Sequence, residues 1–183
     1  MYCRNGGFKL VTTMIKIRQA VRDDAEKIVD ISRRSWRLNI LNQSIGLTSE
    51  MVDARFKNLD SVIQGWQNSI LSQDENNFVL IAEIDSVVVG FCRCGKLEQI
   101  GEIRAMYVDP NFVRKSIGRL LMTEALKKLS CCKKVIVRVA NYNQGAIDFY
   151  QSQGFKKNKV LVNPVRITGD VEIPHIEMEK FIY

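Results

Sequence analysis

The stretch from Tyr107 to Leu126 carries two cations and a glycine at the point where a helix is expected to begin. Arg114 and Lys115 precede Gly118 in "YVDPNFVRKSIGRLLMTEAL". Backbone N–H groups in the first turn of a helix lack intrahelical partners, and the helix dipole adds partial positive charge there. Such a helix start can hold a phosphate. The alternative is that the cations are solvated loop residues and that the glycine only makes a turn.

Composition and charge narrow the class of protein. The chain has 183 residues, 46% apolar and 26% charged, which is typical of one globular domain with a sizeable core. The net charge of +7 favours anionic partners: nucleic acid, an anionic surface or a phosphorylated cofactor. Because no basic tract is interleaved with aromatic residues, nucleic acid is not the expected partner. No apolar run reaches the ~18–20 residues that span a bilayer, so we expect a cytoplasmic protein without a membrane partner.

Cysteine and histidine usage argues against a metal site. The five cysteines stand at positions 3, 92, 94, 131 and 132 without a C-x-x-C pair, and His175 is the only histidine. Zinc sites usually need such spacings. We therefore expect reduced thiols and no metal.

The elements that would position these residues follow from hydrophobic periodicity and turn signals. A strand is expected just after Met14, and a helix from Asp23, which forms a capping pair with Glu26. Asp85 and Ser86 stand between two apolar runs, as in a two-residue hairpin turn. The expected order is a strand (15–20), two or three helices (22–36 and 47–71), three antiparallel strands (78–84, 87–95 and 102–108), a helix (117–129), a strand (133–140), a helix (143–153) and two strands (154–162 and 172–182).

This order predicts an α/β (α+β) fold. It would be a single domain with a mixed, mostly antiparallel central sheet and helices on both faces. Residues 14–183 are assigned to this domain. Residues 1–13 show no clear period and are assigned to an N-terminal extension that can lie outside the fold.

Two motifs in this order resemble those of the GNAT N-acetyltransferases. In "MYVDPNFVRKSIGRLL", a V-x-P turn precedes the family's Q/R-x-x-G-x-G/A pattern; Val113 and Ser116 depart from it and Gly118 is kept. In "NYNQGAIDFYQSQGF", the pattern N-x-x-A-x-x-F-Y-x-x-x-G-F is matched by Asn143, Ala146, Phe149, Tyr150, Gly154 and Phe155. The second motif is the more specific because six positions match at fixed spacing. The alternative is an ordinary amphipathic helix.

The resemblance implies acetyl-CoA as co-substrate, held partly by the helix start and partly by the strand before it. The strand ending at Val108 would splay from the strand 133–140 and admit the pantetheine arm, and the N–H near Met106 would face the thioester oxygen. The alternative for these strand residues is core packing, and both can hold. The implied cofactor-binding residues are Met106, Tyr107, Val108, Val113, Arg114, Lys115, Ser116, Ile117, Gly118, Arg119, Asn143 and Tyr150.

Candidate catalytic residues follow from the chemistry of acetyl transfer. A thiolate leaving group needs an acid, and Tyr150 is the candidate because a phenol stays protonated at neutral pH; the alternative is a buried tyrosine bonded to the backbone. Asn143 resembles the asparagine that bonds the pantetheine amides, unless it caps its own helix. Glu102 is the candidate base, since alternation puts residues 102, 104 and 106 on one face; a solvated glutamate is the alternative. His175 is interpreted as an edge or groove residue in preference to a catalytic base.

The resulting hypothesis is an acetyl-CoA-dependent N-acetyltransferase acting on a primary amine, either a small amine or polyamine or a peptide amine. Homodimerisation is left open. A polyamine acceptor would need acidic groups, for which Glu98, Glu102, Glu172 and Glu177 are available. The alternatives are a non-catalytic acyl-CoA-binding regulatory module and an acetyltransferase acting on an aminoacyl-RNA. At Ser116, we expect a helix N-cap with φ below zero, where serine is favoured.

Overall fold

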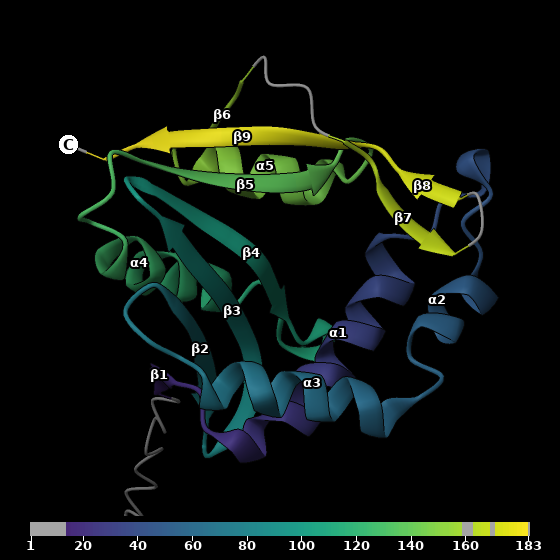
Figure 1. The fold of residues 1–183 in the computed structure, drawn as a ribbon, viewed down its shortest axis with the longest axis horizontal. Helices are drawn as coiled ribbons and strands as arrows, with labels where there is room; N and C mark the ends of the chain where they lie inside the picture. The colour runs from purple at the N-terminus through teal and green to yellow at the C-terminus, as the bar shows by residue number, and fades with distance from the viewer. Residues whose placement is uncertain (1–13, 159–162, 169–170, 183) are drawn as a thin grey trace, which may run out of the picture.

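The computed structural model describes residues 14–158, 163–168 and 171–182. The extension at residues 1–13 and positions 159–162 of the expected strand 154–162 lie outside these ranges. A seven-stranded sheet has the order β1-β2-β3-β4-β5-β9-β6 (Figure 1). Its strands are β1 (Ile15–Gln19), β2 (Asn77–Ile84), β3 (Val87–Leu97), β4 (Ile100–Val108), β5 (Lys134–Ala140), β6 (Lys156–Lys157) and β9 (His175–Phe181).

Pairing within the sheet is antiparallel except between β4 and β5, which are parallel. The predicted mixed, mostly antiparallel sheet is confirmed. The hairpin between β2 and β3 turns at Asp85 and Ser86, both with positive φ, 48° and 65°. Positive φ at both central residues is typical of a type I′ turn, whose twist matches that of the flanking strands.

Helices cover both faces of the sheet (Figure 1). On one face, α4 and α5 pack with a core that includes Cys92, Leu121 and Tyr150. On the other, α1 and α3 pack on Ile81 and Phe91. The helices are α1 (Ala25–Asn39), α2 (Ser49–Arg55), α3 (Leu59–Leu71), α4 (Ile117–Lys128) and α5 (Gln144–Ser152).

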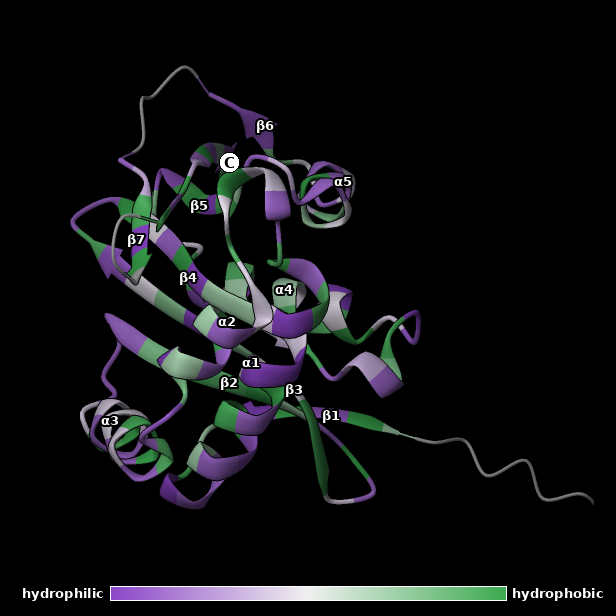
Figure 2. Cartoon of the chain, turned by 90° about the vertical axis from the view of Figure 1, so that its right-hand side faces the viewer, coloured by the Kyte–Doolittle hydropathy of each residue, from purple (hydrophilic) through white to green (hydrophobic). Residues whose placement is uncertain are grey.

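Strands β2 and β3 are buried along most of their length because the helices cover both of their faces. Figure 2 shows hydrophobic colours along these strands at the centre of the molecule. No helix in the described residues is long and apolar enough to cross a bilayer.

Two local features differ from the sequence expectation. Helix α1 begins at Ala25, and the buried acid at its start is Asp24 instead of Asp23. The Asp24 carboxylate accepts hydrogen bonds from the Val21 N–H at 2.8 Å and from the Arg18 guanidinium at 2.7 Å. A buried carboxylate needs such partners, and a sequence pattern does not reveal which of two adjacent acids has them.

The expected last strand is divided at Pro174, which has no N–H to donate to a ladder. Its first part, β8 (Val171–Ile173), pairs with β7 (Val165–Thr168) in a separate two-stranded sheet. Its second part is β9. The sequence pattern did not predict this small hairpin.

The expectation that residues 102, 104 and 106 share one face is wrong. The pairing of β3 with β4 shifts register between Arg93 and Cys94, so that Ile103 and Ala105 pair with neighbouring residues of β3. Ile103 and Met106 therefore pack in the core under α4. Glu102 alternates with Ile103 and faces the other side. A β-bulge of this kind inserts one residue and reverses the alternation beyond it.

Candidate functional site

The parallel strands β4 and β5 separate halfway along their length. They pair from Ile100 with Lys134 to Ile103 with Val137, and the described residues form no β4–β5 pair beyond that point. A cavity of about 250 Å³ occupies the opening. Its lining includes Met106 and Tyr107 from β4, with Asn143 and Tyr150. Because β5 no longer pairs with this part of β4, backbone groups on both strands are available to a ligand.

Tyr150 lies on α5 and reaches this cavity from the core. Its residue is 7% exposed, and its ring packs edge-on against Phe149 and Phe155, with centroids 5.4 and 5.7 Å away. Burial, and secondarily the nearby Cys92 thiol, raises the pKa of the Tyr150 hydroxyl above its usual value. In the described part of the chain this hydroxyl has no hydrogen-bonding partner. It is therefore protonated at neutral pH and free to donate.

Asn143 caps α5 and also lines the cavity. Its Oδ1 atom accepts a hydrogen bond from the Ala146 N–H at 3.1 Å. The Nδ2 group is not used by this cap. The two alternatives raised by the sequence, a helix cap and a bond to the pantetheine amides, are thus compatible, because they would use different atoms of the Asn143 side chain.

A second cavity of about 350 Å³ lies at the start of α4. It brings together seven of the residues that the sequence assigned to cofactor binding: Val108, Val113, Arg114, Ser116, Ile117, Gly118 and Arg119. Lys115 is not in this lining, and its Nζ atom lies 5.0 Å from the centroid of the Phe112 ring. The helix start, with N–H groups that lack intrahelical partners, gives this cavity positive potential.

Ser116 is the N-cap of α4, as expected, but its backbone is left-handed, with φ 61° and ψ 8°. The expectation of φ below zero is wrong. Arg114 also has positive φ, 63°, because the chain must reverse from the extended Val113 into the helix within three residues. Turns containing such residues form concavities of N–H groups that bind anions. Serine therefore stands where the backbone favours glycine.

Gly118 allows α4 to approach α5 closely. A Cβ atom at this position would lie 3.3 Å from Cε2 of Phe149 and 3.8 Å from Cγ2 of Val108. Both of these atoms are side-chain atoms of the protein itself, so the space next to Gly118 is already occupied by core packing. The glycine of the first motif thus has a packing role against the aromatic residue of the second.

An ion pair that the sequence did not predict holds the turn between β4 and α4. The buried Asp109 carboxylate accepts hydrogen bonds from Nη1 and Nη2 of Arg34, at 2.7 and 2.8 Å, and from the Asn111 N–H at 3.0 Å. The Arg34 guanidinium holds the pKa of Asp109 below its usual value. The Asp-Pro turn was visible in the sequence, but its partner is 75 residues away.

Glu102 does not line the β4–β5 cavity. Its carboxylate accepts hydrogen bonds from Arg138 Nη1 at 2.6 Å and Arg104 Nε at 3.2 Å. Arg138 in turn pairs with the buried Glu177 at 3.1 Å. Of the four acids considered for a polyamine groove, Glu98, Glu102, Glu172 and Glu177, the cavity lining contains none.

His175 does line the cavity. Its Nδ1 atom lies 2.8 Å from the Ile173 carbonyl oxygen, which can only accept, so Nδ1 carries the proton and Nε2 has a free lone pair. Burial lowers the pKa of His175 below its usual value. The ring is therefore neutral at pH 7 and able to accept a proton.

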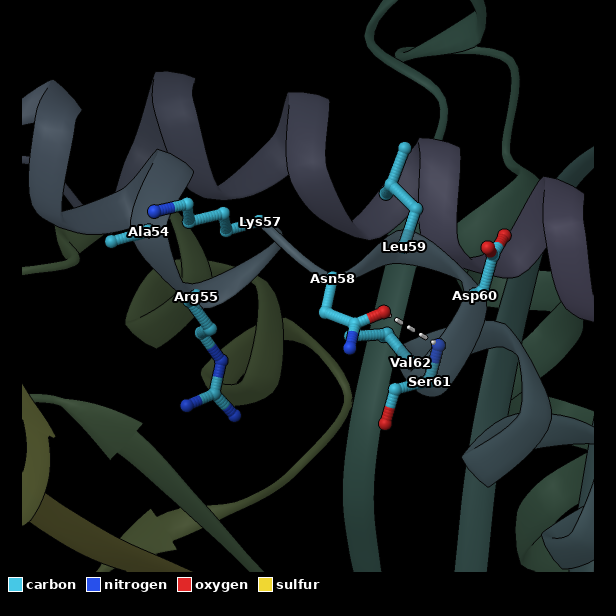
Figure 3. A pocket seen from close by; sticks show the side chains of 8 residues that line it. All are labelled: Ala54, Arg55, Lys57, Asn58, Leu59, Asp60, Ser61 and Val62. Atoms are coloured by element: carbon cyan, nitrogen blue, oxygen red, sulfur yellow. Dashed lines mark hydrogen bonds between the residues drawn. The ribbon is translucent and has the colours of Figure 1, made fainter.

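No group of three or more His, Cys, Asp or Glu side chains in the described ranges is arranged to hold a metal ion. The hollow between α2 and α3, about 610 Å³, contains none of the expected site residues. Figure 3 shows this connection, where Asn58 caps α3 through Ser61 and Arg55 projects to the opposite side from Leu59 and Asp60. Arg55 lines the β4–β5 cavity as well.

Comparison with known proteins shows the family and the fold. A spermidine N(1)-acetyltransferase of Thermoplasma acidophilum is 27% identical over 148 residues, which cover 78% of this chain and 88% of the relative. An uncharacterised N-acetyltransferase of Archaeoglobus fulgidus is 30% identical over 152 residues, covering 78% and 94%. The solved PaiA N-acetyltransferase of T. acidophilum in complex with coenzyme A has a TM-score of 0.74 at 22% identity, covering 92% and 99%. Residues 28–155 match the model of the acetyltransferase (GNAT) family, and the chain therefore belongs to that family.

Proposed function

We propose that the protein transfers the acetyl group of acetyl-CoA to a primary amine. The observation that carries this proposal is the opening between β4 and β5, which is lined by Tyr150 with its protonated hydroxyl and by strand segments that no longer pair with each other. The second cavity, with left-handed turn residues at the start of α4, is suited to the phosphate groups of acetyl-CoA. The names of the relatives support the same reaction class.

Each residue has a distinct part in this proposal. The bound co-substrate supplies the activated acetyl thioester. The N–H groups at the start of α4, with Arg114 and Arg119, bind its anionic groups, and the Asn143 Nδ2 and the Met106 backbone orient the arm between the strands. The Tyr150 hydroxyl donates its proton to the departing sulfur.

His175 is the best-placed base. Its neutral ring, with Nε2 unprotonated, belongs to the cavity lining, whereas Glu102 lies outside that lining and is bound by two arginines. The proposed route takes the proton of the incoming ammonium to Nε2, directly or through a water. This assignment replaces Glu102.

The test is release of free thiol from acetyl-CoA with a panel of amines, with mass spectrometry of the acetylated product. Tyr150→Phe should lower kcat by about 10²-fold or more, and calorimetric CoA affinity should change little, because only proton donation is lost. Tyr142→Phe is the matched control, since the Tyr142 hydroxyl already donates to the Ile40 carbonyl at 2.8 Å and lies outside the cavity lining.

Binding of CoA without thiol release for any amine would instead assign the protein as an acyl-CoA-binding module. Unchanged turnover in Tyr150→Phe would remove this tyrosine as the acid.

A further inference from the structure

A third cavity, of about 400 Å³, adjoins the opening between β4 and β5 on the side of α1–α3. The two cavities share lining residues, among them Trp36, Arg55 and Tyr107. Trp36 donates from Nε1 to the Tyr107 hydroxyl at 2.9 Å, which fixes the wall between them. An acceptor that spans these shared residues would have its amine in the first cavity and the rest of its structure in the third.

The shared and adjoining walls are cationic and aromatic. The Arg55 guanidinium lies 4.7 Å from the Trp36 ring centroid, and that of Arg93 lies 5.4 Å from the Trp66 ring centroid. Neither arginine has an ion-pair partner within the described residues. Arg104 also lines this cavity and is paired with Glu102.

Acidic residues are absent from the described lining of both cavities. Arg93 is half-buried, and burial, followed by repulsion from Arg104, lowers the pKa of its guanidinium. Cations held together in a partly buried groove destabilise each other, and an anionic ligand relieves that repulsion. A guanidinium next to an indole ring still has N–H groups that can donate to a carboxylate, and neither arginine uses them in an ion pair within the described residues.

We propose that the acceptor is a primary amine that also carries a carboxylate, bound by Arg55 and Arg93, and that it is not a polyamine. This inference rests on the proposed acetyl transfer and names its acceptor class. A polyamine would bring further positive charge to a groove lined by arginines. A free amino acid and a peptide with an acidic residue share the recognised group.

The first experiment compares acceptors that differ only in charge. Free amino acids are paired with their amides, and short peptides with glutamate in the second position are paired with the glutamine peptides. The carboxylate form should have the higher kcat/KM by about tenfold or more in at least one pair, and the pair that shows it distinguishes amino acid from peptide. Spermidine is the competing acceptor; if it is used better than every carboxylate, the proposal is wrong.

The second experiment changes the groove. Arg93→Gln and Arg55→Gln should remove most of the preference for carboxylate through a higher KM, and Arg93→Lys should retain part of it. CoA affinity should stay unchanged in the Arg93 variants, because Arg93 is not in the lining of the β4–β5 cavity. Arg22→Gln is the control, because Arg22 is exposed and outside both cavities. Preference that survives in both glutamine variants would refute the proposal.

Binding separates this inference from the proposed reaction. Calorimetric titration of N-acetylglutamate and its diamide analogue into the protein needs no turnover. Absence of thiol release with every amine would refute acetyl transfer, while tighter binding of the acid, dependent on Arg93, would still support a cationic groove that binds carboxylates. Equal binding of both compounds would refute the groove whatever the activity.

Discussion

Replacing Ser116 by glycine should stabilise the protein. Ser116 has φ 61° and ψ 8°, in the left-handed region where a Cβ atom approaches the following carbonyl. That conformation costs an L-residue about 1–2 kcal/mol. Glycine adopts it freely but loses more backbone entropy on folding, which returns about 0.4–1 kcal/mol of the gain. Because Ser116 is exposed and its side chain makes no cap hydrogen bond, little else is lost. The expected net gain in unfolding free energy is about 0.5–1 kcal/mol.

The assay is urea denaturation of wild type and Ser116→Gly, analysed with a common m-value. Ser61→Gly is the matched control, because Ser61 is exposed in the first turn of α3 and has no positive φ. There glycine should destabilise by about 0.5 kcal/mol through helix propensity. A Ser116→Gly midpoint at or below that of wild type would refute the conformational reasoning.

Three further predictions concern Gly118, Asp109 and His175. Gly118→Ala should destabilise the protein by about 1 kcal/mol, because the new Cβ lies 3.3 Å from the Phe149 ring and overpacking outweighs the gain in helix propensity. In a chain that already carries Phe149→Leu, the same alanine should cost much less. Additive effects of the two substitutions on the unfolding free energy would contradict this contact. Since Arg34 lowers the pKa of Asp109, the stability from this carboxylate is present above its usual pKa near ~3.9 and is lost as pH falls through the lowered value. The difference in unfolding free energy between wild type and Asp109→Asn should therefore shrink from about pH 6 to about pH 3, and a constant difference would exclude the linkage. The lowered pKa of His175 keeps its ring neutral, so kcat/KM should fall only below about pH 6.5, and His175→Gln should lose that limb of the profile together with most of the rate.

The order of the elements, and the strands and helices on which the two motifs lie, were predictable from the sequence because they depend on local patterns. Alternating and helical periodicities reflect burial of one face, and the order of the main strands and helices agrees with the structure. The motif around Tyr150 has fixed spacing because its residues share one helix and the turn after it. These signals require only neighbours in sequence.

The remaining features depend on contacts that no local pattern encodes. The bulge that turns Glu102 away from Met106 is a mismatch between two strands, and a single strand's alternation does not reveal it. The bond of Arg34 to Asp109 joins residues 75 positions apart. Arg55 comes from α2 and Arg93 from β3, and only the fold brings both into the lining of the third cavity. In the sequence, each of them looks like an ordinary solvated cation.

The separation of β4 from β5 has a consequence for amide hydrogen exchange. Beyond Ile103, β4 keeps antiparallel pairing with β3 on one side, while its other side faces the opening. Alternate amides along this end should therefore exchange quickly and their neighbours slowly. Helix α1 stabilises this end of β4 instead: Arg34 forms an ion pair with Asp109, and Trp36 donates a hydrogen bond to the Tyr107 hydroxyl. One helix thus replaces the missing sheet partner, and loosening it should speed exchange in both sets of amides at once.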